Sequence, residues 1–251
     1  MNTLTTIKAW RETRASLNGK RIGFVPTMGN LHEGHLALCA RSQQENEVTV
    51  ASIFVNPTQF NQTQDFQSYP RTLDEDIEKL RAAGVNYVFA PNATEIYPDH
   101  FTVQVSETQL SSGLEGEHRP GHFTGMLTVV MKLLNIIQAT RAYFGEKDYQ
   151  QFLLVKKMVE SLFMTVEVVA HQTVRAEDGL ALSSRNSRLS KNARLRAASF
   201  SRLLQSSQSF EEIRSELLSQ GFKVEYLEER WGRRLGAVVL EGVRLIDNVE
   251  V

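Results

Sequence analysis

Two histidines near the N-terminus have the spacing best suited to chemistry. His32 and His35 lie in segment 25–35 (VPTMGNLHEGH), three residues apart at the expected start of a helix, so their imidazoles project from one face. Such a pair can donate hydrogen bonds to phosphate oxygens and stabilise the charge that develops in phosphoryl or nucleotidyl transfer. The helix start also offers backbone N–H groups and a positive end, and Gly29 and Gly34 let the backbone approach a ligand closely.

A metal site is the main alternative for this histidine pair. The string His32-Glu33-Gly34-His35 is one residue shorter than the zinc-binding motif H-E-x-x-H, and no third ligand is evident in the sequence. An expected strand, a glycine turn and a helix start surround the two histidines. This context favours phosphate binding over metal binding.

Amide side chains follow the second expected strand. Asn56 and Gln59 come directly after residues 48–55, and ligands in an open α/β sheet bind outside the carboxyl ends of the strands. Uncharged amides, which both donate and accept hydrogen bonds, suit a small hydroxy acid better than a bare phosphate. The alternative is an ordinary polar turn in which Pro57 ends the strand.

Three loops carry further polar groups. Residues 183–186 (SSRN) offer two hydroxyls, a guanidinium and an amide to phosphate oxygens. Residues 144–151 (FGEKDYQQ) lie at a strand-to-helix junction, where Asp148 is alternatively only an N-cap and Lys147 only a solvated charge. Residues 114–125 are rich in glycine and charge, as loops often are.

The elements that must position these residues alternate along the first two-thirds of the chain. Apolar patterns predict strands at 21–25 (ending at Pro26), 48–55, 86–90, 141–144 and 165–174. Helical patterns lie between them, from near residue 34 and at 72–83, 127–139 and 148–164. This alternation predicts an α/β fold with a Rossmann-like parallel sheet flanked by helices.

The composition changes after residue 185. Residues 187–220 are polar and helical in period, and short strands are expected at 222–227, 236–240 and 243–246. This order predicts a smaller C-terminal α+β domain. We therefore expect two domains, 1–175 and 176–251.

Composition excludes several classes of protein. The 251 residues include 28 Lys and Arg against 29 Asp and Glu, so no basic excess favours a nucleic-acid partner. A single cysteine excludes an intrachain disulfide framework, and Cys39 lies in an apolar stretch typical of a buried residue. No run approaches the roughly 18 apolar residues of a membrane span, so we expect a soluble, cytoplasmic protein with no membrane partner.

The histidine segment resembles one protein family closely. The string Pro26-Thr27-Met28-Gly29-x-Leu31-His32-x-Gly34-His35 is similar to that of pantothenate synthetases (pantoate–β-alanine ligases), within the nucleotidyltransferase superfamily that has the His-x-Gly-His signature. The segments at 54–60, 119–125, 145–148 and 183–186 resemble the same family in the same order. The likeness extends from about residue 21 to 190. Beyond that, 244–248 (RLIDN) resembles the family's end, whereas 230–234 is less recognisable.

The resemblance implies a reaction and its substrates. Pantoate and β-alanine would condense at the expense of ATP, through a pantoyl-adenylate intermediate, to give pantothenate, AMP and pyrophosphate. It also implies Mg²⁺ with the ATP phosphates, although no metal ligand is identified, a C-terminal domain that acts as a lid over the active site, and a homodimer. Small molecules are the expected partners, with no nucleic acid.

The resemblance also implies roles for individual residues. Those expected to be catalytic are His35, His32, Lys147, Ser183 and Arg185. Those expected to bind ATP are Pro26, Thr27, Met28, Gly29, His32, Gly34, His35, Gly145, Glu146, Lys147, Asp148, Val174, Leu182, Ser183, Ser184 and Arg185. Those expected to bind pantoate or β-alanine are Gln59, Gln151, Asn56, Met28, Arg119 and His122.

Two other functions compete with this interpretation. An adenylyltransferase of the same superfamily, acting on a nucleotide or phosphopantetheine, would release pyrophosphate without forming AMP. An RNA-binding relative of a synthetase would use the fold without catalysis, but the near-neutral charge and the absence of an aromatic–basic cluster argue against it. A catalytically dead chain is disfavoured because the histidine, GEKD and SSRN segments are all intact.

Overall fold

The computed structural model describes residues 1–251, which form two compact units. The first unit comprises Met1–Gly145 and Gln150–His171, and the second comprises Glu146–Tyr149 and Gln172–Val251. The chain passes from the first unit to the second between His171 and Gln172, four residues before the predicted domain boundary at 175. The domain bounds 1–175 and 176–251 stay a prediction. The short segment Glu146–Tyr149 belongs to the second unit although its neighbours in sequence belong to the first.

The first unit is built on one parallel sheet, as predicted. Its strand order is β1-β4-β3-β2-β5-β6, and every pairing is parallel. The strands are β1 (Asn2–Leu4), β2 (Ile22–Thr27), β3 (Val48–Ile53), β4 (Tyr87–Phe89), β5 (Arg141–Gly145) and β6 (Glu167–His171). The helices are α1 (Ile7–Ser16), α2 (Glu33–Glu45), α3 (Thr63–Gln67), α4 (Leu73–Ala82), α5 (Ala93–Ile96), α6 (Glu115–His118), α7 (His122–Ile137) and α8 (Tyr149–Ser161).

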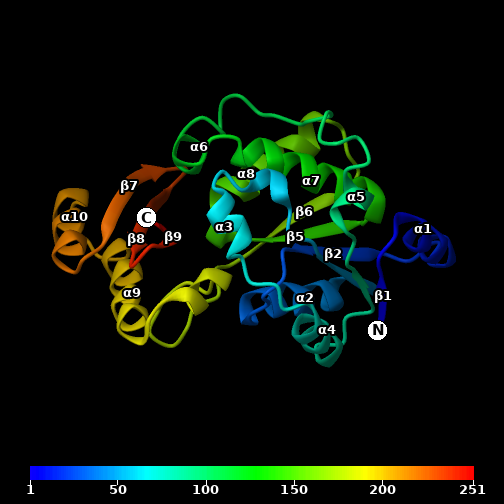
Figure 1. The fold of residues 1–251 in the computed structure, drawn as a ribbon, viewed down its shortest axis with the longest axis horizontal. Coiled ribbons are helices and arrows are strands. Elements are labelled where there is room, and N and C mark those ends of the chain that lie inside the picture. The colour runs from blue at the N-terminus through cyan, green and yellow to red at the C-terminus, as the bar shows by residue number, and fades with distance from the viewer. The chain divides into compact units, whose positions relative to one another are not determined.

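Helices cover both faces of this sheet. Helices α7 and α8 lie on one face, and α2 and α4 lie on the other (Figure 1). Successive residues of β2 supply the two cores: Phe24 packs in the cluster that contains the α7 side chains, and Val25 packs in the cluster with Leu38 of α2 and Leu80 of α4. Burial on both faces explains why these strands are almost continuously apolar.

Several predicted boundaries in the first unit are wrong, and two of them have a clear physical reason. Strand β2 does not end at Pro26 but includes it, and Pro26 pairs with Ser52 of β3. Proline has no backbone N–H, and the nitrogen of Pro26 faces β5. Pairing of β2 with β5 ends at Phe24, so Pro26 removes no hydrogen bond from the sheet. Helix α7 begins at His122, five residues before the predicted start at 127, because Gly121 adopts a φ of 80° directly before the helix.

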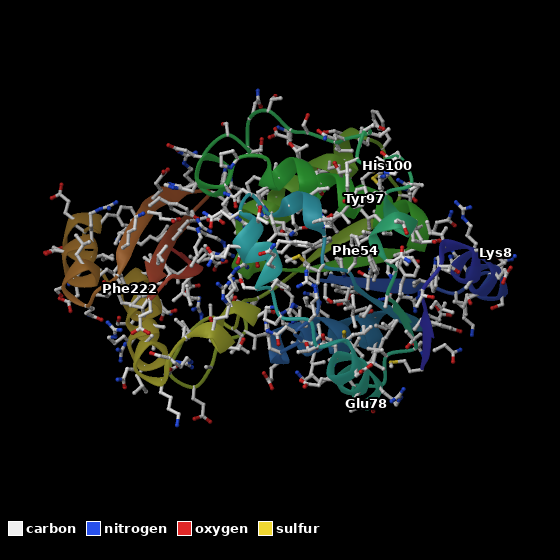
Figure 2. The ribbon with its side chains drawn as sticks, in the orientation of Figure 1. Lys8, Phe54, Glu78, Tyr97, His100 and Phe222 are labelled. Carbon is white, nitrogen blue, oxygen red and sulfur yellow. The ribbon has the colours of Figure 1, made fainter.

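The second unit contains two main helices and an antiparallel sheet, as predicted. Helices α9 (Lys191–Leu204) and α10 (Phe210–Ser219) precede strands β7 (Lys223–Arg230), β8 (Arg233–Leu240) and β9 (Val243–Glu250), which pair in the order β7-β8-β9. Phe222 lies in the core between the helices and the sheet (Figure 2). Strand β9 runs to Glu250, past the predicted end at 246, and this extension carries Asp247 and Asn248.

The single cysteine, Cys39, lies on α2 and is fully buried in the core. Burial raises the pKa of the Cys39 thiol to about 12, so the reactive thiolate is scarce until the pH nears that value. We expect iodoacetamide at pH 8 to leave Cys39 unmodified in the folded protein and to label it readily in urea. Mass spectrometry measures the labelling, and rapid modification of the folded chain would contradict this placement.

None of the helices is both long and apolar enough to cross a membrane.

Candidate active site

The start of α2 is capped by the two histidines themselves. His32 is the N-cap residue, and its Nδ1 accepts a hydrogen bond from the Gly34 N–H at 3.1 Å. His35 closes a reciprocal box, because its Nδ1 accepts from the His32 N–H at 3.3 Å. A ring nitrogen that accepts carries no proton, so each imidazole in this arrangement is neutral and holds its proton on Nε2. The ring centroids are 4.1 Å apart, so the two imidazoles lie side by side at the start of the helix.

The cap also corrects one expectation about this helix start. We expected its backbone N–H groups to be available to a phosphate, but the Gly34 N–H is engaged by His32. The donors that the turn presents are therefore chiefly the imidazoles.

Helix α4 holds the turn that carries these histidines. Asp76 is fully buried, and its carboxylate accepts from the N–H groups of Asn30 at 2.8 Å and Leu31 at 2.7 Å. Lys79, one helical turn later, donates to the Leu31 carbonyl at 2.8 Å. Gly29 precedes them at a φ of 81°, and a Cβ there would lie 3.0 Å from the Asp76 carboxylate. The turn is thus fixed through both its N–H and its C=O groups.

Asn56 is the centre of a buried hydrogen-bond network after β3. Its Oδ1 accepts from the hydroxyls of Tyr97 at 2.7 Å and Thr58 at 3.1 Å. Its Nδ2 donates to the Gln59 Oε1 at 3.0 Å and to the Gly125 carbonyl at 3.1 Å. These four bonds use the whole capacity of the amide. Burial raises the pKa of Tyr97, which keeps its hydroxyl a donor to Asn56.

Aromatic packing supports this network from one side. Phe54 and Tyr97 lie beside each other, with ring centroids 6.3 Å apart (Figure 2). Because the Gln59 Oε1 is held by Asn56, the Gln59 side chain presents its Nε2 amide group as the remaining donor. Gln59 ends a 3₁₀ turn, Pro57–Gln59, at the carboxyl end of β3.

His122 and Arg119 hold the same turn through its backbone. The His122 Nδ1 lies 2.7 Å from the Gln59 carbonyl oxygen, which can only accept, so Nδ1 carries the proton. Its Nε2 then accepts from Arg119 at 3.0 Å. His122 is buried, and this arrangement commits both ring nitrogens. The predicted direct contact of Arg119 and His122 with substrate stays a prediction, while the geometry makes both residues supports of Gln59.

Gly125 permits the close approach of α7 to this turn. A Cβ at residue 125 would lie 2.3 Å from the Thr58 carbonyl oxygen. We expect Gly125→Ala to destabilise the protein by about 1–3 kcal/mol, because the backbone on one side must shift. Urea unfolding measures the loss, with Thr124→Ala on the same helix as the control. A Gly125→Ala midpoint equal to that of Thr124→Ala would disprove the close contact.

Two neighbouring glutamines at the start of α8 differ in their surroundings. Gln150 is buried and donates to the carbonyls of Leu110 and Gly113 at 2.7 and 2.8 Å, while it accepts from the Glu115 N–H at 3.1 Å. Gln151, the one predicted to bind pantoate, is half-buried and makes no such bonds. Its amide is therefore the one of the two that can bind a ligand.

The second unit carries the predicted triphosphate residues. Ser183 is the N-cap of a 3₁₀ turn, Ser184–Arg188, and its hydroxyl accepts from the Arg185 N–H at 3.2 Å. Residues 183–185 are half-buried. They follow a short hairpin over residues 174–182, whose two ends are joined by a hydrogen bond of 3.0 Å from the Leu182 N–H to the Val174 carbonyl.

Lys147 also belongs to the second unit. Its side chain is only 16% exposed, which argues against a merely solvated charge.

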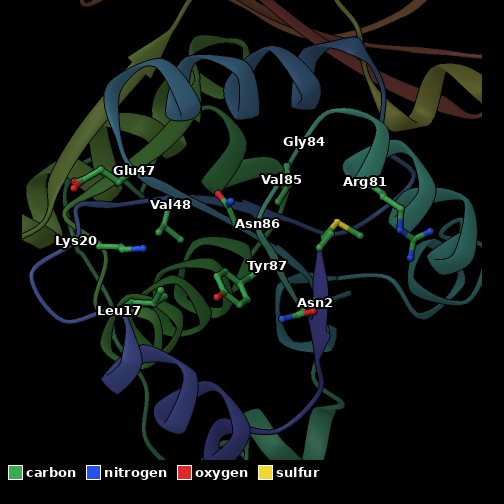
Figure 3. A pocket seen from close by; sticks show the side chains of 11 residues that line it. Asn2, Leu17, Lys20, Glu47, Val48, Arg81, Gly84, Val85, Asn86 and Tyr87 are labelled. Atoms are coloured by element: carbon green, nitrogen blue, oxygen red, sulfur yellow. The ribbon is translucent and has the colours of Figure 1, made fainter.

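A separate cavity lies at the amino ends of the parallel strands, away from the carboxyl ends that carry the predicted site residues. It has a volume of about 400 Å³ and is lined by the residues that begin β1, β3 and β4, with Lys20, Glu47 and Arg81 at its rim (Figure 3). None of the residues predicted to bind substrate lines it. Since ligands of open α/β sheets bind at the carboxyl ends of the strands, this cavity is not the candidate site.

Comparison with known proteins decides the family. The family model for pantoate-beta-alanine ligase matches residues 1–250. The chain belongs to the pantoate–β-alanine ligase family. It is 49% identical over 249 residues to the pantothenate synthetase of Legionella pneumophila (strain Corby), with 99% of both chains covered. It is 46% identical over 246 residues to that of Coxiella burnetii (strain Dugway 5J108-111), which covers 98% of this chain and 95% of the relative.

Solved structures of the ligase family share the fold. The pantoate-beta-alanine ligase from Francisella tularensis, complexed with beta-gamma ATP and beta-alanine, is 40% identical, with a TM-score of 0.96 over 100% of this chain and 97% of that one. The enzyme from Thermus thermophilus is 43% identical, with a TM-score of 0.92 over 100% of this chain and 99% of that one. The resemblance to the ligase family and the predicted fold class are therefore confirmed.

Asp76, which the sequence does not single out, is prominent in the structure because it holds the turn before His32. It lies on the same face of α4 as the buried Leu80, four residues later, and a carboxylate on an apolar stripe is the signal that it accepts buried hydrogen bonds. No three His, Cys, Asp or Glu side chains gather in this chain as a metal site.

Proposed function

We propose that this chain is a pantoate–β-alanine ligase that forms AMP. It condenses pantoate with β-alanine to give pantothenate, and ATP is converted to AMP and pyrophosphate through a pantoyl adenylate. Membership of the ligase family over nearly the whole chain supports this assignment. Within the chain, the observation that carries it is the pair of imidazoles at the start of α2, both held with Nε2–H as donor.

The first step is attack of the pantoate carboxylate on the α-phosphorus of ATP. The bond to the bridging oxygen breaks, and pyrophosphate leaves with the electron pair. We assign His32 and His35 to the phosphate oxygens, where their Nε2–H groups stabilise the negative charge of the transition state. Lys147, Ser183, Ser184 and Arg185 are assigned to the triphosphate as further donors and cations. The chain's task is positioning and charge neutralisation, since this step needs no covalent enzyme intermediate.

The remaining assignments follow the same logic. Val174 and Leu182 are placed beside the adenine, and the backbone of residues 26–29 and 145–148 is placed along the nucleotide. Gln59 and Gln151 are assigned to pantoate, because each has an amide group with a donor not committed to the protein. The adenylate carbonyl then receives the β-alanine amine, AMP leaves, and the amine loses a proton.

Further proposals come mainly from the family. We place Mg²⁺ on the ATP phosphates, because Mg²⁺ is bound mainly by phosphate oxygens and waters and the chain offers no cluster of three ligands. Asp148, the carboxylate that directly follows Lys147, is assigned to the ribose or the metal. We also propose a cytoplasmic homodimer, which light scattering after gel filtration tests, and a C-terminal domain that acts as a lid.

The decisive experiment supplies ATP, pantoate and β-alanine and measures AMP. We expect AMP to form in proportion to pantothenate, and we expect no AMP when β-alanine is replaced by an amine-free analogue such as propionate. Release of pyrophosphate without amine-dependent AMP would reject the ligase and favour an adenylyltransferase of the same superfamily. Thermal stabilisation by ATP with pantoate beyond that by ATP alone reports binding of both substrates.

A further inference from the structure

The segment Glu146–Tyr149 is held by the C-terminal strand of the second unit. Asn248 of β9 donates through its Nδ2 to the carbonyl of Glu146 at 2.8 Å and to that of Lys147 at 2.9 Å. These bonds explain why the segment belongs to the second unit although it connects β5 with α8. The backbone that carries Lys147 is thus fixed from β9.

Arg233 of β8 fixes the orientation of this amide. Its Nη1 donates to the Asn248 Oδ1 at 2.9 Å, and since a guanidinium only donates, the Nδ2 group must face the two carbonyls. Arg233 also pairs with the Glu146 carboxylate at 3.0 Å and lies 4.3 Å from the centre of the Tyr149 ring. Asn248 is 2% exposed and Arg233 7%, so water does not compete with these contacts.

The residue before Asn248 holds the stretch that leads to the predicted triphosphate residues 183–185. Asp247 accepts two hydrogen bonds from Arg175, at 2.7 and 2.9 Å, and a third from the Ser201 hydroxyl. Arg175 donates in turn to the Gly179 carbonyl and pairs with Ala181, two residues before Ser183. Adjacent residues of β9 therefore fix both segments, 146–147 and 175–181.

We propose that Asn248 is a positioning residue for the ligation reaction. With Arg233 it sets the backbone at residues 146–147, so that Lys147 is held in a constant relation to residues 183–185, which Asp247 sets through Arg175. The inference rests on the proposed function, in which Lys147 and residues 183–185 bind the triphosphate. It gives a structural role to the C-terminal segment 244–248 (RLIDN). A displacement of about 1 Å in such a group lowers turnover by about 10²-fold.

The test is the isosteric variant Asn248→Asp. Its carboxylate still accepts from Arg233, but an oxygen replaces the amino group that faces the two carbonyl oxygens, so attraction becomes repulsion. We expect kcat to fall by about 10- to 100-fold and KM for ATP to rise, while KM for pantoate stays within about twofold, because Gln59 and Gln151 belong to the first unit. Leu245→Val, in the core on the same strand, controls for general loosening and is expected to keep both constants.

The outcomes separate this inference from the proposed function. A wild-type chain that forms no AMP overturns both. If the wild type is active and Asn248→Asp keeps the same kcat and KM for ATP, only the inference is overturned. The inference is also overturned if KM rises equally for all substrates and Leu245→Val shows the same rise. If Asn248→Asp does not fold, Arg233→Lys removes the fork that joins Asn248 to Glu146 while it keeps the charge. It is expected to raise KM for ATP selectively, and an unchanged KM overturns the proposal.

Discussion

A His35→Ala variant is expected to lose about 10²-fold or more in kcat. The imidazole of His35 is held by its Nδ1 against the His32 N–H, which leaves Nε2–H as a donor of fixed direction. Removal of one such preorganised donor from a developing charge costs about 10²- to 10³-fold in other enzymes. Steady-state release of AMP measures the loss. KM for pantoate should change little, because the pantoate amides come from other elements.

The control for this prediction must separate the cap from the chemistry. His32→Asn does so, because asparagine is a favoured N-cap that can accept from the Gly34 N–H as His32 does, but it has no group at the position of Nε2. We expect its unfolding midpoint in urea to stay near the wild-type value while kcat falls by about 10²-fold. The exposed His118→Ala variant should keep its activity. If the His32 and His35 variants lose stability and activity in parallel, both histidines act only as caps of the helix and not on the phosphates.

The parallel sheet is predictable from sequence because its signal is repeated. Most of its strands are apolar on both faces and are separated by helical patterns, so several local observations support one architecture. Strand β1 has only three residues, two of them exposed, and gives no such signal. The boundaries that failed depend on neighbours that a local pattern does not contain. Pro26 continues a strand where β5 stops pairing at Phe24. The glycine-rich stretch before residue 127 forms helix because Gly121 adopts a φ of 80° and Gly125 allows close approach to the turn at Thr58.

The candidate site divides in a similar way. Its histidines, glutamines and serines are recognisable because a short string contains both the side chain and the turn that presents it. The residues that hold those strings are distant in sequence: Asp76 lies 46 residues beyond Asn30, and Asn248 lies 101 residues beyond Lys147. An aspartate or asparagine in such a position has no local signature except its place on an apolar face, so tertiary contacts are needed to find it.

An Asp76→Ala variant is expected to lose both stability and turnover. Its carboxylate is fully buried and accepts from Asn30, Leu31 and the Thr72 hydroxyl, so alanine leaves two buried N–H groups without partners. Each unsatisfied group costs about 1–3 kcal/mol, so the two together give a loss of about 2–6 kcal/mol in the free energy of unfolding. The hydrogen bond from Lys79 to the Leu31 carbonyl would remain, while the bond from the Leu31 N–H to Asp76 is lost. Urea unfolding measures the first effect.

The second effect follows from where that turn leads. Leu31 is joined directly to His32, so a turn released by about 1 Å moves both imidazoles away from the phosphates, and kcat should fall by about 10- to 100-fold even where the variant is fully folded. Asp74→Ala is the matched control, since Asp74 lies in the same helical turn but is exposed, and it should retain both properties. A folded Asp76→Ala variant with wild-type kcat would show that the histidines keep their direction without α4, and the capping box alone would then account for their placement.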